Sequence, residues 1–275
     1  MEKIGMIGLG AMGTALLERL NLAGVQPTVY DSYTPSLDRA RSLRAVIAPS
    51  AAAVAQDSTI VDIVVRTDQD TMDCITGKEG VLEGARPGTL ILLHSTILPG
   101  TTRELAKIAR DREIHVIDAC MVAVPSAVRE NSLTFLVGGP PELVERARPH
   151  LLKMGKQVLH MGPVGAGNIA KLVKNLVNGA ETLIIHEAIQ IGLAGDIPYT
   201  DALDMLRKVY SGTILNRWEN RFDPSGADPA PRIDSITFEK DIPLAGELAR
   251  EYGLHLPITE QIVAAANRLL RRVAS

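Results

Sequence analysis

The segment that most constrains the fold of this 275-residue chain is Ile4-Gly5-Met6-Ile7-Gly8-Leu9-Gly10-Ala11-Met12-Gly13. Its apolar first half predicts a buried strand, and its glycines predict a tight turn that leads into a helix. The first two glycines of the turn let backbone N–H groups approach a pyrophosphate, and the third lets the helix pack closely on the strand. The free N–H groups and the positive dipole end of that helix favour the same anion. We therefore expect a dinucleotide to contact Gly8, Leu9, Gly10, Ala11, Met12 and Gly13.

The residues that follow favour a dinucleotide site over an ordinary glycine turn, which is the alternative. Thr14 to Leu22 has the apolar spacing of an amphipathic helix, and residues 26–30 form a predicted second strand that ends at Asp31. Asp31 lies 18 positions after Gly13, near the spacing of about 20 expected for a carboxylate that binds a ribose. Such a carboxylate accepts hydrogen bonds from ribose hydroxyls and repels a 2′-phosphate. Ser32-Tyr33-Thr34 contains no cation, so we expect NAD to be preferred over NADP.

The pattern of apolar runs predicts an α/β fold with two domains. Predicted strands cover residues 3–8, 26–30, 44–48, 59–65, 89–94, 114–118 and 133–137. Several are apolar throughout and alternate with helical stretches, which is typical of a doubly wound parallel sheet. Beyond Gly162-Pro163 only helical patterns follow, at 165–194, 200–211, about 236–252 and about 257–273. We expect a Rossmann-type NAD(P)-binding domain at 1–163 and an all-helical substrate and dimerisation domain at 164–275, with residues 222–231 in an exposed loop.

Composition excludes several classes of function. A formal net charge of −3 gives no electrostatic reason to bind nucleic acid or an anionic membrane. Two distant cysteines, Cys74 and Cys120, form neither a disulfide framework nor a metal-binding cluster. The first strand is not preceded by a basic segment followed by an apolar one, which is the pattern of a secretory signal peptide. We therefore expect a cytoplasmic protein. The long segment 165–194 contains Lys171, Lys174, Glu181 and Glu187, which favours a helix buried in protein over a membrane span.

One face of that long helix is polar. Lys171, Asn175, Asn178 and Thr182 follow at helical spacing, and apolar residues cover most of the remaining surface. Buried polar groups cost free energy unless they meet partners, ligand or water. A desolvated lysine also loses its proton more readily, which suits proton transfer near neutral pH. The alternative is a lysine that simply faces solvent at the start of the helix.

Four segments resemble, in order along the chain, the motifs of a known family. They are Gly8-Leu9-Gly10-Ala11-Met12-Gly13, His94-Ser95-Thr96-Ile97-Leu98-Pro99, Gly165-Ala166-Gly167-Asn168-Ile169-Ala170-Lys171-Leu172-Val173-Lys174-Asn175 and Lys240-Asp241-Ile242-Pro243-Leu244-Ala245. The family is the β-hydroxyacid dehydrogenases of the 6-phosphogluconate dehydrogenase superfamily. It includes 3-hydroxyisobutyrate dehydrogenase, tartronate semialdehyde reductase and the glyoxylate/succinic semialdehyde reductases. The resemblance spans nearly the whole chain, and four ordered motifs are far more specific than any single one.

The resemblance implies a site and a reaction. By analogy with the family, Lys171 is the catalytic acid/base and Asn175 orients the substrate. Ser95 and Thr96 lie by the cofactor, and Lys240 reaches toward it from the helical domain. The reaction is the transfer of a hydride between NAD and a small 3-hydroxy acid or its aldehyde. The family also implies a homodimer or homotetramer.

The chain departs from the family at the substrate loop. The family reads Asp-Ala-Pro-Val-Ser-Gly-Gly where this chain reads Asp118-Ala119-Cys120-Met121-Val122-Ala123-Val124. A hydroxyl donor is lost, and side chains occupy space that glycine leaves free. Either the substrate is bulkier and less polar there, or a cation elsewhere binds its carboxylate. Lys174, which replaces an asparagine of the family, is one candidate cation; the others are Arg66, Arg217 and Arg221, each of which has a surface role as its alternative.

Substrate contacts are therefore expected at Asn175, Lys174, Val122, Ala123 and Val124. Two other readings stay open. The first is an imine reductase on the same fold, which the presence of Lys171 disfavours because those relatives lack this lysine. The second is a catalytically silent NAD-binding protein, which Lys171, Asn175 and Lys240 together disfavour.

Overall fold

The computed structural model describes residues 2–209 and 237–273. It divides into two compact units, Met1–Lys171 and Leu172–Ser275, and each is described by itself. Helix α9 (Ala166–Ala194) begins in the first unit and continues into the second. The predicted boundary at 163/164, just before this helix, stays a prediction about which segments fold independently.

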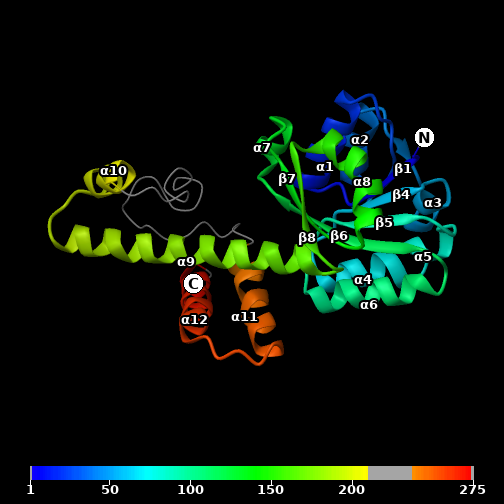
Figure 1. Cartoon of the computed structure of the whole chain (residues 1–275). Coiled ribbons are helices and arrows are strands. Elements are labelled where there is room, and N and C mark those ends of the chain that lie inside the picture. The colour runs from blue at the N-terminus through cyan, green and yellow to red at the C-terminus, as the bar shows by residue number, and fades with distance from the viewer. Residues whose placement is uncertain (1, 210–236, 274–275) are drawn as a thin grey trace. The chain divides into compact units, whose positions relative to one another are not determined.

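The first unit contains one eight-stranded sheet in the order β3-β2-β1-β4-β5-β6-β7-β8 (Figure 1). Its strands are β1 (Ile4–Ile7), β2 (Thr28–Tyr30), β3 (Val46–Ile47), β4 (Ile60–Ile63), β5 (Leu90–Leu93), β6 (His115–Val122), β7 (Thr134–Gly138) and β8 (Gln157–Gly162). All neighbouring pairs are parallel except β6 and β7. The chain reverses its winding direction between β1 and β4, and ligands bind at such a switch point in doubly wound sheets. The predicted Rossmann-type fold is confirmed.

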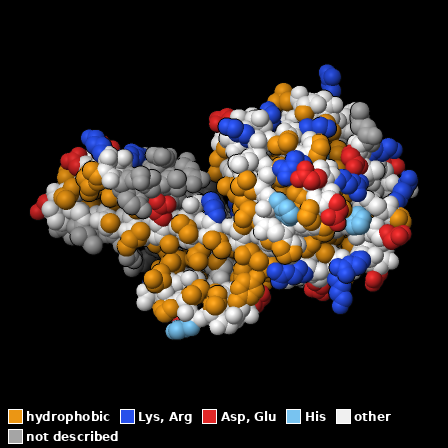
Figure 2. All heavy atoms as spheres, viewed as in Figure 1, with side chains coloured by type: hydrophobic (Ala, Val, Ile, Leu, Met, Phe, Trp, Pro, Cys, Tyr) orange, Lys and Arg blue, Asp and Glu red, His pale blue; other side chains and the backbone are white. Residues whose placement is uncertain are grey.

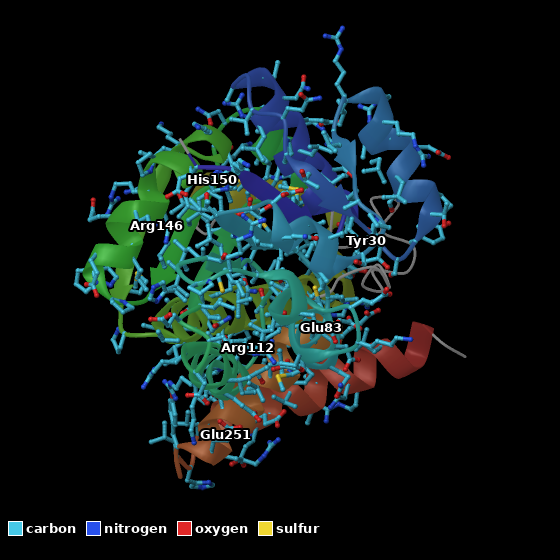
Figure 3. The ribbon with its side chains drawn as sticks, turned by 90° about the vertical axis from the view of Figure 1, so that its right-hand side faces the viewer. Tyr30, Glu83, Arg112, Arg146, His150 and Glu251 are labelled. Atoms are coloured by element: carbon cyan, nitrogen blue, oxygen red, sulfur yellow. The ribbon has the colours of Figure 1, made fainter. Side chains whose placement is uncertain are left out.

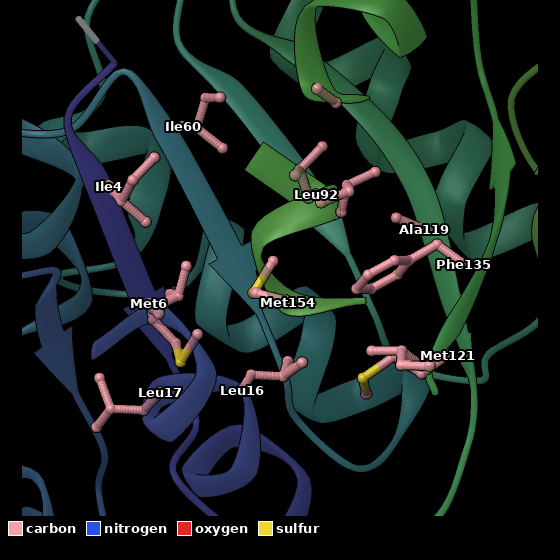
Figure 4. Close-up of a cluster of buried hydrophobic side chains, with 14 of the residues drawn as sticks. Ile4, Met6, Leu16, Leu17, Ile60, Leu92, Ala119, Met121, Phe135 and Met154 are labelled. Carbon is pink, nitrogen blue, oxygen red and sulfur yellow. The ribbon is translucent and has the colours of Figure 1, made fainter. Parts of the chain in front are cut away.

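Helices cover both faces of this sheet. They are α1 (Ala11–Leu22), α2 (Thr34–Ser42), α3 (Ala51–Gln56), α4 (Asp68–Thr76), α5 (Val81–Gly84), α6 (Pro99–Arg110), α7 (Pro125–Arg129) and α8 (Pro141–Met154). One core cluster packs α1 and α8 against the sheet, with Met6, Leu16 and Phe135 fully buried (Figure 4). A second packs α3, α4 and α6 against the opposite face. Because both faces are buried, strands such as β5 (Leu90-Ile91-Leu92-Leu93) are apolar at every position.

The far end of the sheet differs from the sequence-based expectation in two ways. Strand β7 runs antiparallel to β6; the connection between them holds only the short helix α7, and a parallel crossover needs a dozen or more residues. Strand β8 was not predicted. It is an edge strand with mostly exposed side chains, so it lacks the apolar run that identifies the central strands.

All secondary structure in the described part of the second unit is helical. Its elements are the continuation of α9, α10 (Tyr199–Val209), a π-helical turn (Thr237–Asp241), α11 (Ile242–Glu251) and α12 (Pro257–Val273). Phe238 and Ile242 pack with Leu183 of α9 and Ala266 of α12 in one small core. The predicted helices are confirmed within the described ranges, whereas the predicted loop at 222–231 lies outside them.

Helix α9 is not buried all round, contrary to expectation. Val173, Val177 and Ile184 are 58%, 60% and 62% exposed. Figure 2 shows hydrophobic side chains gathered on the surface of the helical unit. None of the helices in the described ranges combines the length and hydropathy that crossing a membrane would require.

Candidate active site

The glycine turn between β1 and α1 requires two of its three glycines for steric reasons. Gly8 has a φ of +93°, and a Cβ there would lie 2.3 Å from the Val64 carbonyl oxygen. A Cβ on Gly13 would lie 2.0 Å from the carbonyl oxygen of Gly8. At Gly10 an added Cβ would meet nothing within 4 Å. The turn is therefore packed tightly against the sheet on one side and open at Gly10, where a pyrophosphate needs room.

Asp31 lies directly beside this turn. Its carboxylate accepts hydrogen bonds from the backbone N–H of Leu9 (2.5 Å) and from that of Tyr33 (2.8 Å). A pocket of about 490 Å³ opens here, lined by residues that include Gly8, Gly10, Tyr30 and Asp31; Tyr30 is labelled in Figure 3. Open backbone at Gly10 and a carboxylate in the same pocket fit the pyrophosphate and ribose of a dinucleotide.

The segment after β5 is fixed by buried hydrogen bonds. Ser95 is buried, and its hydroxyl donates to the Val65 carbonyl oxygen (2.6 Å). The Ser95 carbonyl oxygen accepts a hydrogen bond from the Nδ2 of Asn168 (3.2 Å). Thr96 is half-buried. Ser95 therefore has a role in the architecture of the loop, and contact of Ser95 or Thr96 with the cofactor stays a prediction.

A buried charged cluster lies next to this segment. Asp62 of β4 pairs with His94 Nε2 (2.8 Å) through one oxygen and with His150 Nε2 (2.7 Å) through the other. His150 belongs to α8 (Figure 3), and His94 Nδ1 donates to the Ala119 carbonyl oxygen (2.8 Å). Burial alone would raise the pKa of Asp62, but His150 and His94 hold that pKa well below its usual range. The cluster ties β4, β6 and α8 to the residue that precedes Ser95.

The side chain of Lys171, on α9, reaches the end of strand β6. Its Nζ donates to the Met121 carbonyl oxygen (2.5 Å). Strand β6 extends to Val122, so the first five residues of the expected substrate loop, Asp118 to Val122, belong to a strand and only Ala123 and Val124 lie beyond it. Val122 and Ala123 are half-buried, and Val124 is 46% exposed at the N-terminal end of α7. The ammonium group is thus held one residue away from the segment where the family's serine and glycines are replaced.

The start of α9 is attached to the same strand. Asp118 accepts hydrogen bonds from the backbone N–H of Gly165 (2.7 Å) and from that of Asn168 (2.8 Å). Burial raises the pKa of Asp118 to about 6, although backbone N–H groups act in the opposite direction. Sequence reasoning quoted Asp118 and Asn168 only as parts of motifs. The available signal was a charged residue at the end of an otherwise apolar run.

In the second unit the structure brings four further polar residues together. Asn175 donates through Nδ2 to Asp241 (2.6 Å) and accepts through Oδ1 from Lys174 Nζ (3.1 Å). Lys240 Nζ lies 3.8 Å from Asp241 Oδ1. Asp241 was not singled out from the sequence, although it stands in the quoted Lys-Asp motif. Of the other candidate cations, Arg66 is exposed in the first unit, and Arg217 and Arg221 lie outside the described residues.

The chain is similar along its length to named dehydrogenases. Residues 3–162 match the family described as the NAD-binding domain of 6-phosphogluconate dehydrogenase. The NAD-dependent L-serine dehydrogenase of Pseudomonas aeruginosa is 28% identical, over 99% of this chain and 93% of that protein. A probable mitochondrial 3-hydroxyisobutyrate dehydrogenase of Arabidopsis thaliana is 30% identical, over 94% of this chain and 79% of that protein. The solved structure of Mycobacterium tuberculosis 3-hydroxyisobutyrate dehydrogenase with L-serine shares the fold, with a TM-score of 0.82, 24% identity and coverage of 98% and 93%.

Proposed function

The chain belongs to the β-hydroxyacid dehydrogenases, NAD(P)-dependent oxidoreductases, and on this premise we propose that it interconverts a small 3-hydroxy acid and its aldehyde or keto form. Lys171 is the proposed acid/base. The observation that carries the proposal is the hydrogen bond from Lys171 Nζ to the Met121 carbonyl oxygen, which holds an ammonium group beside the substrate loop.

Gly8, Gly10, Gly13 and Asp31 would hold the cofactor, because they line or shape the pocket at the β1–α1 turn. When bound there, NAD would supply the hydride-transfer chemistry at the carbinol carbon of the substrate. In oxidation Lys171 takes the proton of the substrate hydroxyl, and in reduction it donates a proton to the carbonyl oxygen. Its positive charge also stabilises the alkoxide that develops on that oxygen.

The polar cluster of the second unit supplies the proposed orientation of the substrate. Asn175 has its amide group fixed by Asp241 and Lys174, so the direction of its remaining N–H is defined. Lys174 is the proposed partner of a substrate carboxylate, since the loop Val122-Ala123-Val124 provides no hydroxyl. L-serine and 3-hydroxyisobutyrate, which the relatives' names indicate, are the first substrates to assay. Bulkier 3-hydroxy acids and semialdehydes follow, to probe the changed loop.

Substitution of the proposed acid/base tests the assignment. We expect Lys171→Ala to lower kcat by at least about 100-fold, the lower end of what general acid–base catalysis contributes. NADH binding, measured by fluorescence titration, stays close to that of the unmodified chain because Lys171 is not part of the glycine turn. The matched control is Lys156→Ala, which removes an exposed lysine of the first unit and leaves kcat unchanged.

Three results would contradict the proposal. Full turnover by the Lys171→Ala variant would remove the acid/base role. Turnover of cyclic imines without turnover of any hydroxy acid or aldehyde would favour the imine reductase reading. NADH binding without turnover of any member of the substrate panel would favour the silent NAD-binding protein.

A further inference from the structure

The first turn of α9 receives its capping group from the sheet. The residue before the helix is Gly165, which has no side chain and a φ of +91°. Asp118 of β6 fills this role through two separate oxygens, Oδ1 to Gly165 N–H and Oδ2 to Asn168 N–H. A carboxylate at a helix N-terminus satisfies N–H groups that have no partner within the helix, and it interacts favourably with the helix dipole.

The carboxylate is enclosed so closely that its position is fixed. A Cβ on Gly138 would lie 2.6 Å from Asp118 Oδ1, and a Cβ on Gly167 would lie 2.7 Å from Oδ2. The side chain of Asn168 is fixed as well. Its Oδ1 accepts from the hydroxyl of Thr102 (2.8 Å), and its Nδ2 donates to the Ser95 carbonyl oxygen (3.2 Å). The first turn of α9 is thereby attached to β6, to α6 and to the segment after β5.

The same strand also holds the proposed acid/base. Met121 lies three positions after Asp118 on β6, and its carbonyl oxygen accepts the hydrogen bond from Lys171 Nζ. On α9, Lys171 lies three positions after Asn168. One short length of β6 therefore fixes both the backbone at the start of α9 and the ammonium group one turn later.

We infer that Asp118 is a positioning residue for Lys171, and this inference rests on the proposed function. Asp118 sets the register of the first turn of α9 against β6, so that the Lys171 side chain reaches the end of the strand. Burial raises the pKa of Asp118 to about 6 even though its oxygens accept backbone hydrogen bonds, so ionising this carboxyl costs more free energy in the folded chain than in the unfolded one. A gain in stability from its charge therefore does not explain an aspartate at this position.

A double-mutant cycle tests this inference. Asp118→Asn keeps the size of the side chain, but it replaces one of the two accepting oxygens with an NH2 group that faces a backbone N–H. We expect kcat to fall roughly 10- to 100-fold, as for a misplacement of the reacting group by about 1 Å. NADH affinity stays within about twofold. In the Lys171→Ala background the same substitution causes no further loss, because both changes act through one group.

Two controls keep the test decisive. Asp111→Asn removes an exposed carboxylate just after α6 and leaves kcat unchanged. If Asp118→Asn does not fold, Thr102→Val replaces it in the cycle, because it frees the same turn of α9 through Asn168 with a substitution of similar size. Loss of kcat that vanishes in the Lys171→Ala background supports the inference for either variant.

The inference and the proposed function fail in different ways. Unchanged kcat in a folded Asp118→Asn variant overturns the positioning role while the effect of Lys171→Ala stands. A further loss of activity on top of Lys171→Ala, together with weakened NADH binding, shows general structural damage and also overturns it. If Lys171→Ala itself keeps full turnover, the proposed function fails first.

Discussion

At the scale of single residues, Asp31 has two roles that the sequence pattern does not separate. Its carboxylate organises the glycine turn through Leu9 N–H and also lines the adjacent pocket. Each carboxylate oxygen can accept more than one hydrogen bond, so the contacts to Leu9 and Tyr33 leave capacity for ribose hydroxyls. The negative charge in this pocket disfavours a second negative charge from a 2′-phosphate.

We therefore expect kcat/KM to be higher with NADH than with NADPH, by roughly tenfold or more, which corresponds to about 1.4 kcal/mol. Asp31→Asn removes the negative charge and keeps a hydrogen-bond acceptor, so it lowers the ratio of kcat/KM with NADH to kcat/KM with NADPH. Asp38→Asn, a change at an exposed carboxylate of α2, leaves the ratio unchanged. Steady-state kinetics with both cofactors measures it. A clear preference of the unmodified chain for NADPH would refute the role given to Asp31.

At the scale of elements, the start of α9 explains why its motif contains glycine. Gly167 is the second residue of α9, and Gly100 is the second residue of α6. A Cβ at Gly167 would lie 2.4 Å from the Leu136 carbonyl oxygen, whereas a Cβ at Gly100 would meet nothing within 4 Å. The two glycines share a helical position and differ in the space around them.

This pair predicts opposite effects of one substitution. Gly167→Ala forces α9 away from β7 and lowers the free energy of unfolding by about 1–3 kcal/mol, the usual cost of overpacking. Gly100→Ala raises the free energy of unfolding by up to about 1 kcal/mol, because alanine loses less backbone entropy than glycine on entering a helix. Urea denaturation of both variants measures the difference. Equal effects would show that the packing at Gly167 does not limit stability.

At the scale of the whole molecule, each unit has a core of its own, but α9 keeps an apolar face exposed. Val173 and Val177 are one helical turn apart, and Ile184 follows at a spacing that keeps it on a nearby face. Large exposed apolar side chains grouped on one helix are typical of surfaces that meet another protein. A second copy of the chain is the occupant that family resemblance favours.

We accordingly expect a homodimer or homotetramer in solution. Light scattering on the purified chain at several concentrations gives the molar mass directly. Val177→Glu introduces a charge into the apolar face and shifts the mass toward that of the monomer. Leu22→Glu, at a side chain of α1 that is 75% exposed, does not. A monomeric unmodified chain would contradict the expectation.

Local sequence patterns predicted much of this molecule because their physical causes are local. A strand buried on both faces is apolar at each position, a tight turn needs glycine, and an amphipathic helix repeats every few residues. These rules predicted the Rossmann-type unit, the helices after residue 165 and the cofactor turn with Asp31. They missed β8, since an edge strand is exposed, and they wrongly implied that β7 is parallel to its neighbour β6.

The spatial neighbours of the charged residues could not be read from such patterns. Asp62 meets His94 and His150, which lie 32 and 88 positions away in sequence. Asp118 meets the start of α9 from 47 positions away. Such pairs form because strands and helices that are distant in sequence pack side by side. The periodicity of apolar residues does not predict which elements become neighbours. The sequence by itself therefore identified the glycine turn and the proposed lysine. The residues that position that lysine, such as Asp118, were identified only from the tertiary structure, because they come close to it through packing.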